Sequence, residues 1–360
     1  MKADILRNEE RAIFALRQLY SGYGYLPYKM SRFEEYDLYV RNKDFLASQE
    51  IITFADRNGR LLALKPDVTL SIIQNTVDRP GQVQKLYYNE NVYRVDKGTN
   101  TFRESMQAGL ECVGDLSAYD IAEVLLLAVK SLEKLGGRFV LDLSHMGLIS
   151  AALAESGLDE EGQLEALGFL RQKNIHELSL LCGRQAIEAA QAEKLRRLAE
   201  CRGGVQVLAE MEKLLTSPRE RQALAELKSL LGILSSFGDA VQVDFSVGGD
   251  MKYYSGVVFR GYLERIPVSV LSGGQYDKLL RKMGRSSSAI GFSVNVNLLE
   301  QNTKNTDVDT VLLHDGTADP AALAAAAEEA AKEGTVLVAA QLPTDRCWKR
   351  VIRFGEEKEC

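Results

Sequence analysis

The sequence predicts an α+β fold that is built on an antiparallel β-sheet, carries a block of inserted helices and ends in a small β-α-β unit. Residues 85–114 hold two apolar and aromatic runs on either side of a polar loop, as in two long antiparallel strands. Residues 155–237 are rich in Ala, Leu, Glu, Gln, Lys and Arg at helical spacing. After Glu300 a polar linker precedes a strand, an alanine-rich helix and a second strand. We therefore expect a core over residues 1–304, with the helical insertion inside it, and a small truncated α/β domain over residues 305–360.

The composition is that of an ordinary globular chain. Of its 360 residues, 46% are hydrophobic and 26% are charged, which is enough for one large core and a smaller domain. No apolar run approaches the ~20 residues that a membrane-spanning helix needs, and the N-terminal segment has no apolar signal core. We expect a cytoplasmic protein without membrane contact. The net charge of −6 lowers the expectation of a nucleic-acid partner without excluding a local basic patch.

Neither a metal centre nor a disulfide framework is expected. The five cysteines are odd in number and include no CxxC pair, and the three histidines lie far apart. Zinc sites need ligands at short, regular spacings. We expect Cys112 to pack as a small core residue, and His145, His176 and His314 to be structural or exposed.

The first 75 residues predict a helix, a hairpin and a second helix. Apolar residues at helical spacing indicate a helix over 4–20, which a Ser-Gly-Tyr-Gly turn ends. The Asn58-Gly59 pair lies between apolar runs and indicates a hairpin over 54–64. Asp67 then stands where its carboxylate can cap the next helix.

The second strand of the long hairpin has a polar face. Residues two apart in a strand share a face, so one face carries Arg103, Ser105, Gln107, Gly109 and Glu111. This row suits the floor of a pocket for a small zwitterion. It also suits the solvated face of an antiparallel sheet, and periodicity alone favours that second interpretation.

The remaining elements follow from local signals. Ser117 and Asp120 resemble a capping box for an amphipathic helix over 117–135, and a short strand follows over 139–143. Four or five helices are expected in the insertion, with their charged faces solvated or in contact with a partner. Strict alternation predicts a strand over 241–245. In the C-terminal domain we expect strands over 310–313, 335–339 and 350–354, and a helix over 320–332 with Asp319 as its N-cap.

Several segments resemble the histidyl form of the class II aminoacyl-tRNA synthetases. Tyr93-Arg94 and residues 103–111 resemble motif 2 of that family, and Lys65-Pro66-Asp67-Val68-Thr69 resembles its Arg-Pro-Glu-x-Thr loop. Residues 253–259 and 271–277 resemble its Tyr-Tyr-Ser-Gly and Gly-Gly-x-Tyr-Asp signatures, and residues 288–293 lead into a segment that resembles its motif 3 helix. The resemblance covers about residues 1–300. It implies a class II synthetase-like antiparallel sheet flanked by helices, and the last domain resembles a shortened anticodon-binding domain.

The resemblance also implies a histidine pocket. In that family the residues that match Asp67 and Thr69 hold the α-ammonium, and the tyrosines build the imidazole pocket with the glutamate that matches Glu111. An ammonium suits a carboxylate and a hydroxyl, and an imidazole needs one donor and one acceptor. The expected histidine-binding residues are Asp67, Thr69, Arg94, Gln107, Glu111, Tyr253 and Tyr254. Two alternatives stay open: Asp67 only caps a helix, and the two tyrosines only pack in the core.

Departures from the family indicate lost catalysis. Gly249, Thr101 and Leu298 stand where the family has arginines, and Lys252 stands where it has an aspartate. Only Arg94 is clearly retained. Removing one preorganised donor from a site of developing charge costs roughly 10²–10³ in rate. We therefore expect no adenylation, no catalytic residue and no cofactor, although Lys252 can supply a point charge.

A pocket that binds histidine without activating it resembles the regulatory subunits of ATP phosphoribosyltransferase, which are histidyl-synthetase paralogues. That resemblance implies a non-catalytic chain that activates a short-form catalytic subunit and confers feedback inhibition by L-histidine in histidine biosynthesis. It also implies dimers within a hetero-octamer, without tRNA. Three alternatives stay open: an active histidyl-tRNA synthetase, another synthetase-like enzyme, and a binding module for an amino acid or uncharged tRNA.

Overall fold

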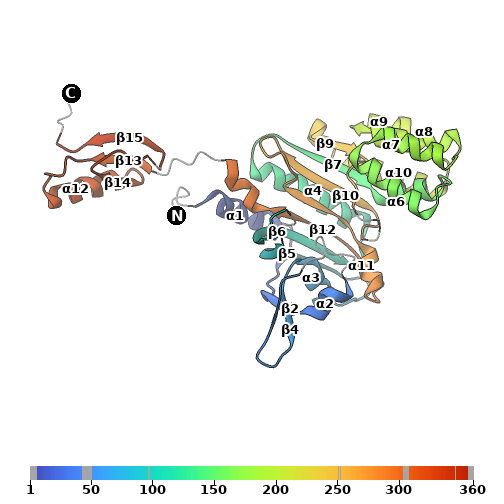
Figure 1. The fold of residues 1–360 in the computed structure, drawn as a ribbon, viewed down its shortest axis with the longest axis horizontal. Helices are drawn as coiled ribbons and strands as arrows, with labels where there is room; N and C mark the ends of the chain where they lie inside the picture. The colour runs from blue at the N-terminus through green and yellow to red at the C-terminus, as the bar shows by residue number, and fades with distance from the viewer. Residues whose placement is uncertain are drawn as a thin grey trace. The chain divides into compact units, whose positions relative to one another are not determined.

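The computed structural model describes residues 6–42, 51–95, 98–249, 251, 253–302, 308–344 and 346–355. It divides into two compact units, residues 1–300 and 301–360 (Figure 1). Lys252 and Cys360 lie outside the described residues, as do Ile5 and part of the polar loop at 96–101. Within the described part of the chain, no helix combines the length and the apolar character that crossing a membrane requires.

A nine-stranded sheet forms the centre of the first unit. Its spatial order is β1 (Leu26–Pro27), β5 (Val83–Val95), β6 (Phe102–Gly114), β12 (Ser288–Asn295), β11 (Leu271–Gln275), β10 (Val257–Leu263), β7 (Phe139–His145), β9 (Val241–Asp244) and β8 (Arg202–Gly203). All neighbours are antiparallel except the pairs β1–β5 and β7–β9. The predicted antiparallel sheet is therefore confirmed.

The hairpin of β5 and β6 is the longest pairing in this sheet. Its register runs from Val83 opposite Gly114 to Val95 opposite Phe102, which confirms the two predicted strands. Alternate residues of β6 face different layers, because successive side chains of a strand point to opposite faces. Cys112 packs with the large core, as predicted, while Val113 belongs to a second cluster on the other face.

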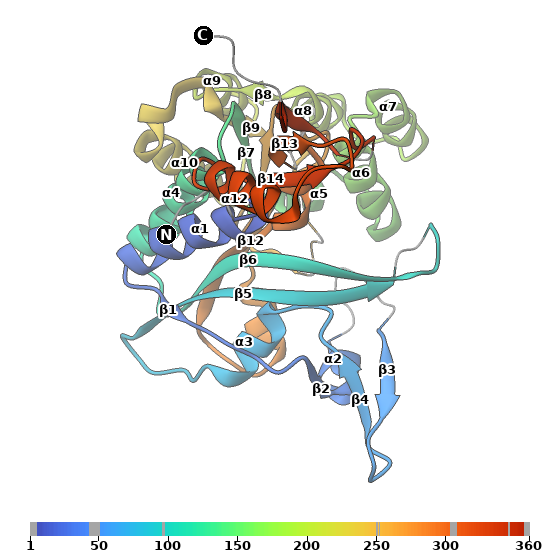
Figure 2. The same ribbon diagram turned by 90° about the vertical axis from the view of Figure 1, so that its left-hand side faces the viewer.

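Helices cover the two faces of this hairpin differently. The helices α1 (Asn8–Gly22) and α4 (Ala118–Leu135) pack on the face of Cys112, where Tyr20 and Ser131 share a hydrogen bond of 3.0 Å. The short helices α3 (Thr69–Asn75) and α11 (Asp277–Lys282) pack on the face of Val113. Figure 2 shows α1 and α3 on opposite sides of β5 and β6. The capping box predicted for α4 is present, since the Ser117 hydroxyl and the Asp120 carboxylate bond reciprocally to backbone N–H groups.

The insertion folds as expected. Helix α5 (Met146–Ala154) leads into it, and residues 155–237, all of which the structure describes, form five helices: α6 (Glu160–Gln172), α7 (Ile175–Arg184), α8 (Ala189–Glu200), α9 (Gln206–Glu212) and α10 (Pro218–Ile233). Lys173 ends α6 with a positive φ of 53°, and Ser217 caps α10. A buried ion pair of 2.7 Å joins Lys194 to Glu220. Strand β8 was not predicted, because two residues carry no periodicity.

A small three-stranded sheet lies near the N-terminus. The predicted hairpin forms β3 (Thr53–Ala55) and β4 (Leu61–Leu64), and β2 (Phe33–Glu35) adds a third strand that the sequence pattern did not indicate. Helix α2 (Tyr36–Arg41) follows β2 directly.

The second unit is a parallel β-α-β arrangement. Strand β13 (Val308–Leu313) lies between β14 (Val336–Ala339) and β15 (Trp348–Arg353), and both pairings are parallel. Helix α12 (Pro320–Ala331) begins after Asp319, whose carboxylate accepts a 3.0 Å hydrogen bond from the N–H of Ala322. The predicted strands, helix and N-cap are confirmed.

The segment after β12 differs in part from its expected helix. It forms a 3₁₀-helix, η4 (Val296–Asn302). A second 3₁₀-helix, η3 (Ser235–Ala240), precedes β9. The side chain of Leu298 packs against the large core. A longer α-helix at this place is therefore not present in the described residues.

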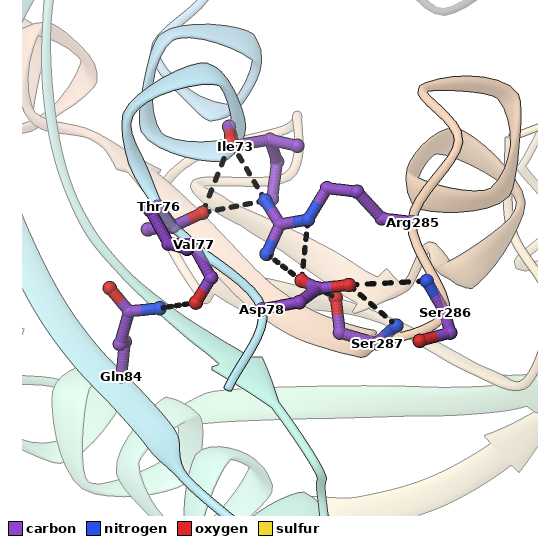
Figure 3. A network of polar contacts seen from close by, with 8 residues as sticks. All are labelled: Ile73, Thr76, Val77, Asp78, Gln84, Arg285, Ser286 and Ser287. Atoms are coloured by element: carbon purple, nitrogen blue, oxygen red, sulfur yellow. Dashed lines mark hydrogen bonds and ion pairs between the residues drawn. The ribbon is translucent and has the colours of Figure 1, made fainter. Parts of the chain in front are cut away.

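An arginine clamp fixes the end of α3 to the start of β12 (Figure 3). Arg285 donates hydrogen bonds of 2.8 Å to the Ile73 carbonyl and to the Thr76 hydroxyl, and its Nε donates to Asp78 at 2.6 Å. The Ser287 hydroxyl donates to the same carboxylate. Burial opposes ionisation of Asp78, but these bonds outweigh it and lower the pKa of Asp78 to about 2.

We expect Asp78→Asn to lower the free energy of unfolding by about 1–3 kcal/mol, because the variant loses charge-assisted hydrogen bonds and leaves Arg285 without its counter-ion. Urea denaturation of the two proteins at neutral pH measures the difference. Asp56→Asn is a suitable control, because Asp56 accepts its hydrogen bonds within the exposed hairpin turn. Equal losses in both variants would contradict a special contribution of the clamp.

Candidate functional site

A cavity of about 330 Å³ opens on the face of the sheet that carries α3 and α11. Its walls come from the start of α3, from β5 and β6, and from the segment between β9 and β10, while β11 and β12 form much of its floor. All seven residues that the sequence placed at a histidine site line this one cavity: Asp67, Thr69, Arg94, Gln107, Glu111, Tyr253 and Tyr254. Its volume lies within the usual range for small-molecule sites.

Glu111 is the most constrained of these groups. Its side chain lies on the polar face of β6 and is only 2% exposed, so that this face is a pocket floor at Glu111 and not a solvated surface. The hydroxyl of Thr69 donates a 2.7 Å hydrogen bond to one carboxylate oxygen, and the hydroxyl of Tyr276 donates to the other. Burial raises the pKa of Glu111 to about 8, with a smaller contribution from the charge of Asp67, although both hydrogen bonds oppose the shift.

Asp67 serves two purposes in this geometry. Its carboxylate accepts a 2.9 Å hydrogen bond from the N–H of Leu70 in the first turn of α3, and it also lines the cavity. The capping interpretation and the pocket interpretation are therefore both compatible with its position. Arg94 lies alongside, where its Nε donates to the Pro66 carbonyl at 3.0 Å. Burial raises the pKa of Asp67, and the Leu70 bond and the charge of Arg94 act in the opposite direction.

Three tyrosines form an aromatic wall. The ring centroids of Tyr253 and Tyr254 lie 4.6 Å apart at an angle of 70°, and those of Tyr253 and Tyr276 lie 5.6 Å apart. Burial raises the pKa of each hydroxyl, so all three stay protonated and can donate hydrogen bonds. Aromatic rings beside a buried carboxyl suit a flat, polar ring such as imidazole.

Three glycines allow close packing around the cavity. An added Cβ at Gly291 would lie 1.7 Å from Oε2 of Glu111, and one at Gly274 would lie 2.8 Å from the ring of Tyr254. At Gly109 it would lie 2.6 Å from the ring of Tyr88. Glycine is thus required at these three points by close packing, because each neighbour occupies the place of a side chain.

Position 249 has no room for a side chain. An added Cβ at Gly249 would lie 1.9 Å from Cδ2 of Tyr254. The ring of Tyr254 therefore fills the space into which an arginine at this position would project. Thr101, the second position without an arginine, is exposed and shares a 2.7 Å hydrogen bond with Thr99.

The lining residues that the sequence had not assigned to the cavity include Tyr88, Arg171, Arg260 and Tyr276. Tyr276 belongs to the Gly-Gly-x-Tyr-Asp segment, so its signal was present in the sequence. Arg260 alternates with apolar residues of β10, and Arg171 comes from α6 of the insertion. The expectation that the charged faces of the insertion are only solvated or at a partner is therefore corrected for Arg171. Among the described residues three arginines line the cavity, whereas the family resemblance identified Arg94 alone.

A metal site is not found in the described part of the chain, where no three His, Cys, Asp or Glu side chains are grouped to hold an ion. His145 is buried, and its Nδ1 accepts the N–H of Leu148 at the start of α5. Its Nε2 lies 3.1 Å from a carboxylate oxygen of Glu226. These contacts give His145 the structural role that its sequence context indicated.

Comparison with known proteins identifies the family of this chain. A family model described as histidyl-tRNA synthetase matches residues 3–299. The ATP phosphoribosyltransferase regulatory subunit of Geobacillus kaustophilus is 32% identical over 270 residues, which are 73% of this chain and 68% of the relative. The chain belongs to the histidyl-tRNA synthetase family and, within it, to the ATP phosphoribosyltransferase regulatory subunits.

Other regulatory subunits of this family are similar to the chain in sequence and in structure. The Clostridium acetobutylicum protein of the same name is 29% identical over 293 residues, covering 79% of this chain and 72% of the relative. A solved structure from Bacillus halodurans, described as an ATP phosphoribosyltransferase regulatory subunit/histidyl-tRNA synthetase, superposes with a TM-score of 0.75. It is 26% identical and covers 96% of this chain and 93% of that one. The class II synthetase-like fold expected from the motifs is thereby confirmed.

In this member of the regulatory-subunit family, we expect the buried carboxyl of Glu111 to make stability depend on pH. Its pKa rises from 4.5 to about 8 on folding, so the folded protein binds more protons than the unfolded chain between these values. Stability should therefore fall as pH rises through this window. Glu111→Gln cannot ionise, so its stability relative to the wild type should increase between about pH 5 and about pH 9.

Chemical denaturation of both proteins across this range tests the expectation. Thr69, Tyr276 and Asp67 also face the carboxyl, and Asp67 is the other acid among them. Asp67→Asn is therefore a useful comparison for its share of the effect. A difference between Glu111→Gln and the wild type that stays constant with pH would refute the assignment.

Proposed function

We propose that this chain is a non-catalytic regulatory subunit in histidine biosynthesis, which activates a short-form ATP phosphoribosyltransferase catalytic subunit and mediates its feedback inhibition by L-histidine. The effector binds in the cavity on the α3 face of the sheet. The names of the relatives support the regulatory role. The chemistry of the cavity supports the choice of ligand.

The arrangement around Glu111 carries the proposal for histidine. A buried carboxyl with a pKa near 8 exchanges its proton in the same range as an imidazole does, so the two can share one proton in a hydrogen bond. The hydroxyl of Tyr254, whose pKa is raised by burial, supplies a further donor. Asp67, which opens on the same cavity, provides the carboxylate for the α-ammonium, and Thr69 lies next to it.

The blocked position 249 supports the absence of adenylation. In-line displacement at phosphorus needs cations placed where charge develops, and losing one such donor costs roughly 10²–10³ in rate. The ring of Tyr254 excludes a side chain at Gly249, and Thr101 and Leu298 offer no charge. Lys252 lies outside the described residues, so no contact is assigned to it.

Regulation requires that histidine distinguishes two states of the assembly. A ligand that binds both states with equal affinity does not shift the equilibrium between them. We propose that the chain dimerises within a hetero-octamer with the catalytic subunit, without tRNA, and that the cavity changes its affinity for histidine between the active and inhibited assemblies. The alternative function is that of a histidyl-tRNA synthetase or of another synthetase-like paralogue that binds an amino acid. The match to the histidyl-tRNA synthetase family model favours this alternative.

Isothermal titration calorimetry of the purified chain separates these functions. We expect L-histidine to bind and ATP to give no heat, and we expect no ATP–pyrophosphate exchange. Exchange activity together with tight ATP binding would establish a synthetase instead. If neither ligand binds the isolated chain, the titration is repeated on the complex with the catalytic subunit. Absence of histidine binding to the complex would refute the proposed effector site.

A further inference from the structure

The charges of the cavity are divided between two ends. Asp67, Thr69 and Glu111 lie at the end formed by α3 and β6, and two arginines that the sequence had not assigned line the end formed by β10 and α6. Glu111 is largely protonated at neutral pH because its pKa is about 8. Asp67 is then the one acid that opposes three arginines among the described lining residues. This excess of positive charge indicates an anionic group in the ligand.

The sheet register places Arg260 in line with the floor of the cavity. Arg260 pairs with Ser272 of β11, Ser272 pairs with Ser293 of β12, and Ser293 pairs with Gly109 of β6. These cross-strand partners share one face of the sheet. Small residues alone therefore separate Arg260 from β6 along this row, and the two serine hydroxyls face the same cavity. Along this row, only the two small serine side chains lie between Arg260 and β6.

The two arginines meet at the segment that precedes Tyr253. Nη2 of Arg260 donates to the Gly248 carbonyl at 3.3 Å, and a Cβ added at Gly248 would lie 3.1 Å from Cγ of Arg171. Both side chains thus lie beside the stretch that includes Gly249. The described residues place no carboxylate within ion-pair range of either guanidinium, and Arg260 is half-buried with one long hydrogen bond. A half-buried guanidinium has five donors to satisfy.

Arg94 differs from this pair. It lies at the acidic end, its Nε is held by the Pro66 carbonyl, and its charge acts on Asp67. Arg94 therefore balances an acid that is already present. The register also places Asp142 of β7 opposite Arg260. Neither Arg171 nor Arg260 forms an ion pair with a described residue, so their guanidinium groups can pair with a ligand.

We propose that Arg260 and Arg171 bind the α-carboxylate of the amino acid whose ammonium lies at Asp67, in place of a side chain that position 249 cannot hold. This inference rests on the proposed function, because it assumes an amino acid in the cavity. A guanidinium matches a carboxylate with two parallel N–H donors, and Ser272 and Ser293 add hydroxyl donors. Because Arg171 belongs to α6, the bound carboxylate joins the helical insertion to the sheet.

The test compares two ligands that differ only at the carboxylate. L-Histidine and L-histidinamide are titrated calorimetrically into the wild type, Arg260→Gln, Arg260→Lys and Arg171→Gln. Arg219→Gln is the control, since Arg219 is an exposed arginine on α10 that does not line the cavity. We expect Arg260→Gln to weaken L-histidine by about 10- to 100-fold, the effect of losing a charged hydrogen-bond partner, and to change L-histidinamide by less than about twofold.

Arg260→Lys should recover part of the affinity, because it keeps the charge and loses the fork. Arg171→Gln should show the same selectivity with a smaller effect, because Arg171 is exposed. Since that exposed residue can be changed without disturbing the core, its variant keeps the test valid if Arg260→Gln fails to fold. The control should bind both ligands as the wild type does.

Four results would overturn the inference. Equal weakening of both ligands would show a general disturbance of the cavity, and unchanged L-histidine binding in both glutamine variants would show that the carboxylate lies elsewhere. Inorganic phosphate is titrated as a third probe. If it binds in the presence of saturating L-histidine and loses affinity in Arg260→Gln, the arginines serve an independent anion. If the wild type binds neither histidine nor histidinamide, alone or in the complex, the proposed function itself fails and the inference with it.

Discussion

Gly291→Ala is expected to abolish histidine binding and to lower the free energy of unfolding by about 1–3 kcal/mol, the usual cost of overpacking a core. The added methyl group would lie 1.7 Å from Oε2 of Glu111 and 2.6 Å from the Leu110 carbonyl. The carboxylate can rotate away, but the carbonyl belongs to the neighbouring strand and can move only with the backbone. The hydrogen bonds from Thr69 and Tyr276 would then be lost together.

Urea denaturation and histidine calorimetry measure the two effects on the same protein. Gly168→Ala is the matched control: Gly168 lies inside α6, and a Cβ there meets nothing within 4 Å. This control should gain about 0.5–1 kcal/mol, because alanine is the better helix former. A Gly291→Ala protein of normal stability that still binds histidine would contradict the close packing described for this strand.

Glu111→Ala and Gln107→Ala are expected to weaken histidine inhibition of the assembled complex by about 10- to 100-fold, the equivalent of one or two lost hydrogen bonds in a buried site. Glu111→Ala should have the larger effect, because Glu111 is buried and its loss leaves two hydroxyl donors without an acceptor. Both residues line the cavity. Assembly with the catalytic subunit should therefore be unaffected.

Inhibition curves and size-exclusion chromatography of the complexes test these two statements. Glu104→Ala on the same strand is the control, because Glu104 is exposed and does not line the cavity. It should leave the inhibition constant unchanged. Wild-type inhibition in both pocket variants would show that the effector binds outside this cavity. A loss of assembly would show that β6 takes part in the interface with the catalytic subunit.

The sequence predicts elements well where local chemistry decides them. Capping residues placed the starts of α4 and α12, and the Asn58-Gly59 turn placed the hairpin of β3 and β4. The seven residues assigned to the site line one cavity. Whether the polar face of β6 is wet or buried was not decided by its own pattern, because the answer depends on α3 and on β11 and β12, which come from distant parts of the chain.

The features missed by the sequence have the same physical origin. Arg171 is separated from Arg260 by 89 positions in the chain, and nothing near either residue indicates that both face Gly248. Tyr276 was recognised as part of a motif, but its bond to Glu111 becomes visible only when β11 is placed beside β12. Short strands such as β2 and β8 are defined by their partners and have too few residues for a periodic signal.

The ring of Tyr254 against Gly249 has a consequence for how this chain can change over time. A single substitution cannot install an arginine at position 249, since its first side-chain carbon would overlap the ring. The ring itself is confined by Gly274 on the adjacent strand, so moving it requires a further change elsewhere. A mutational path that restores a side chain at position 249 must therefore also move the ring of Tyr254, and that movement changes the wall of the cavity.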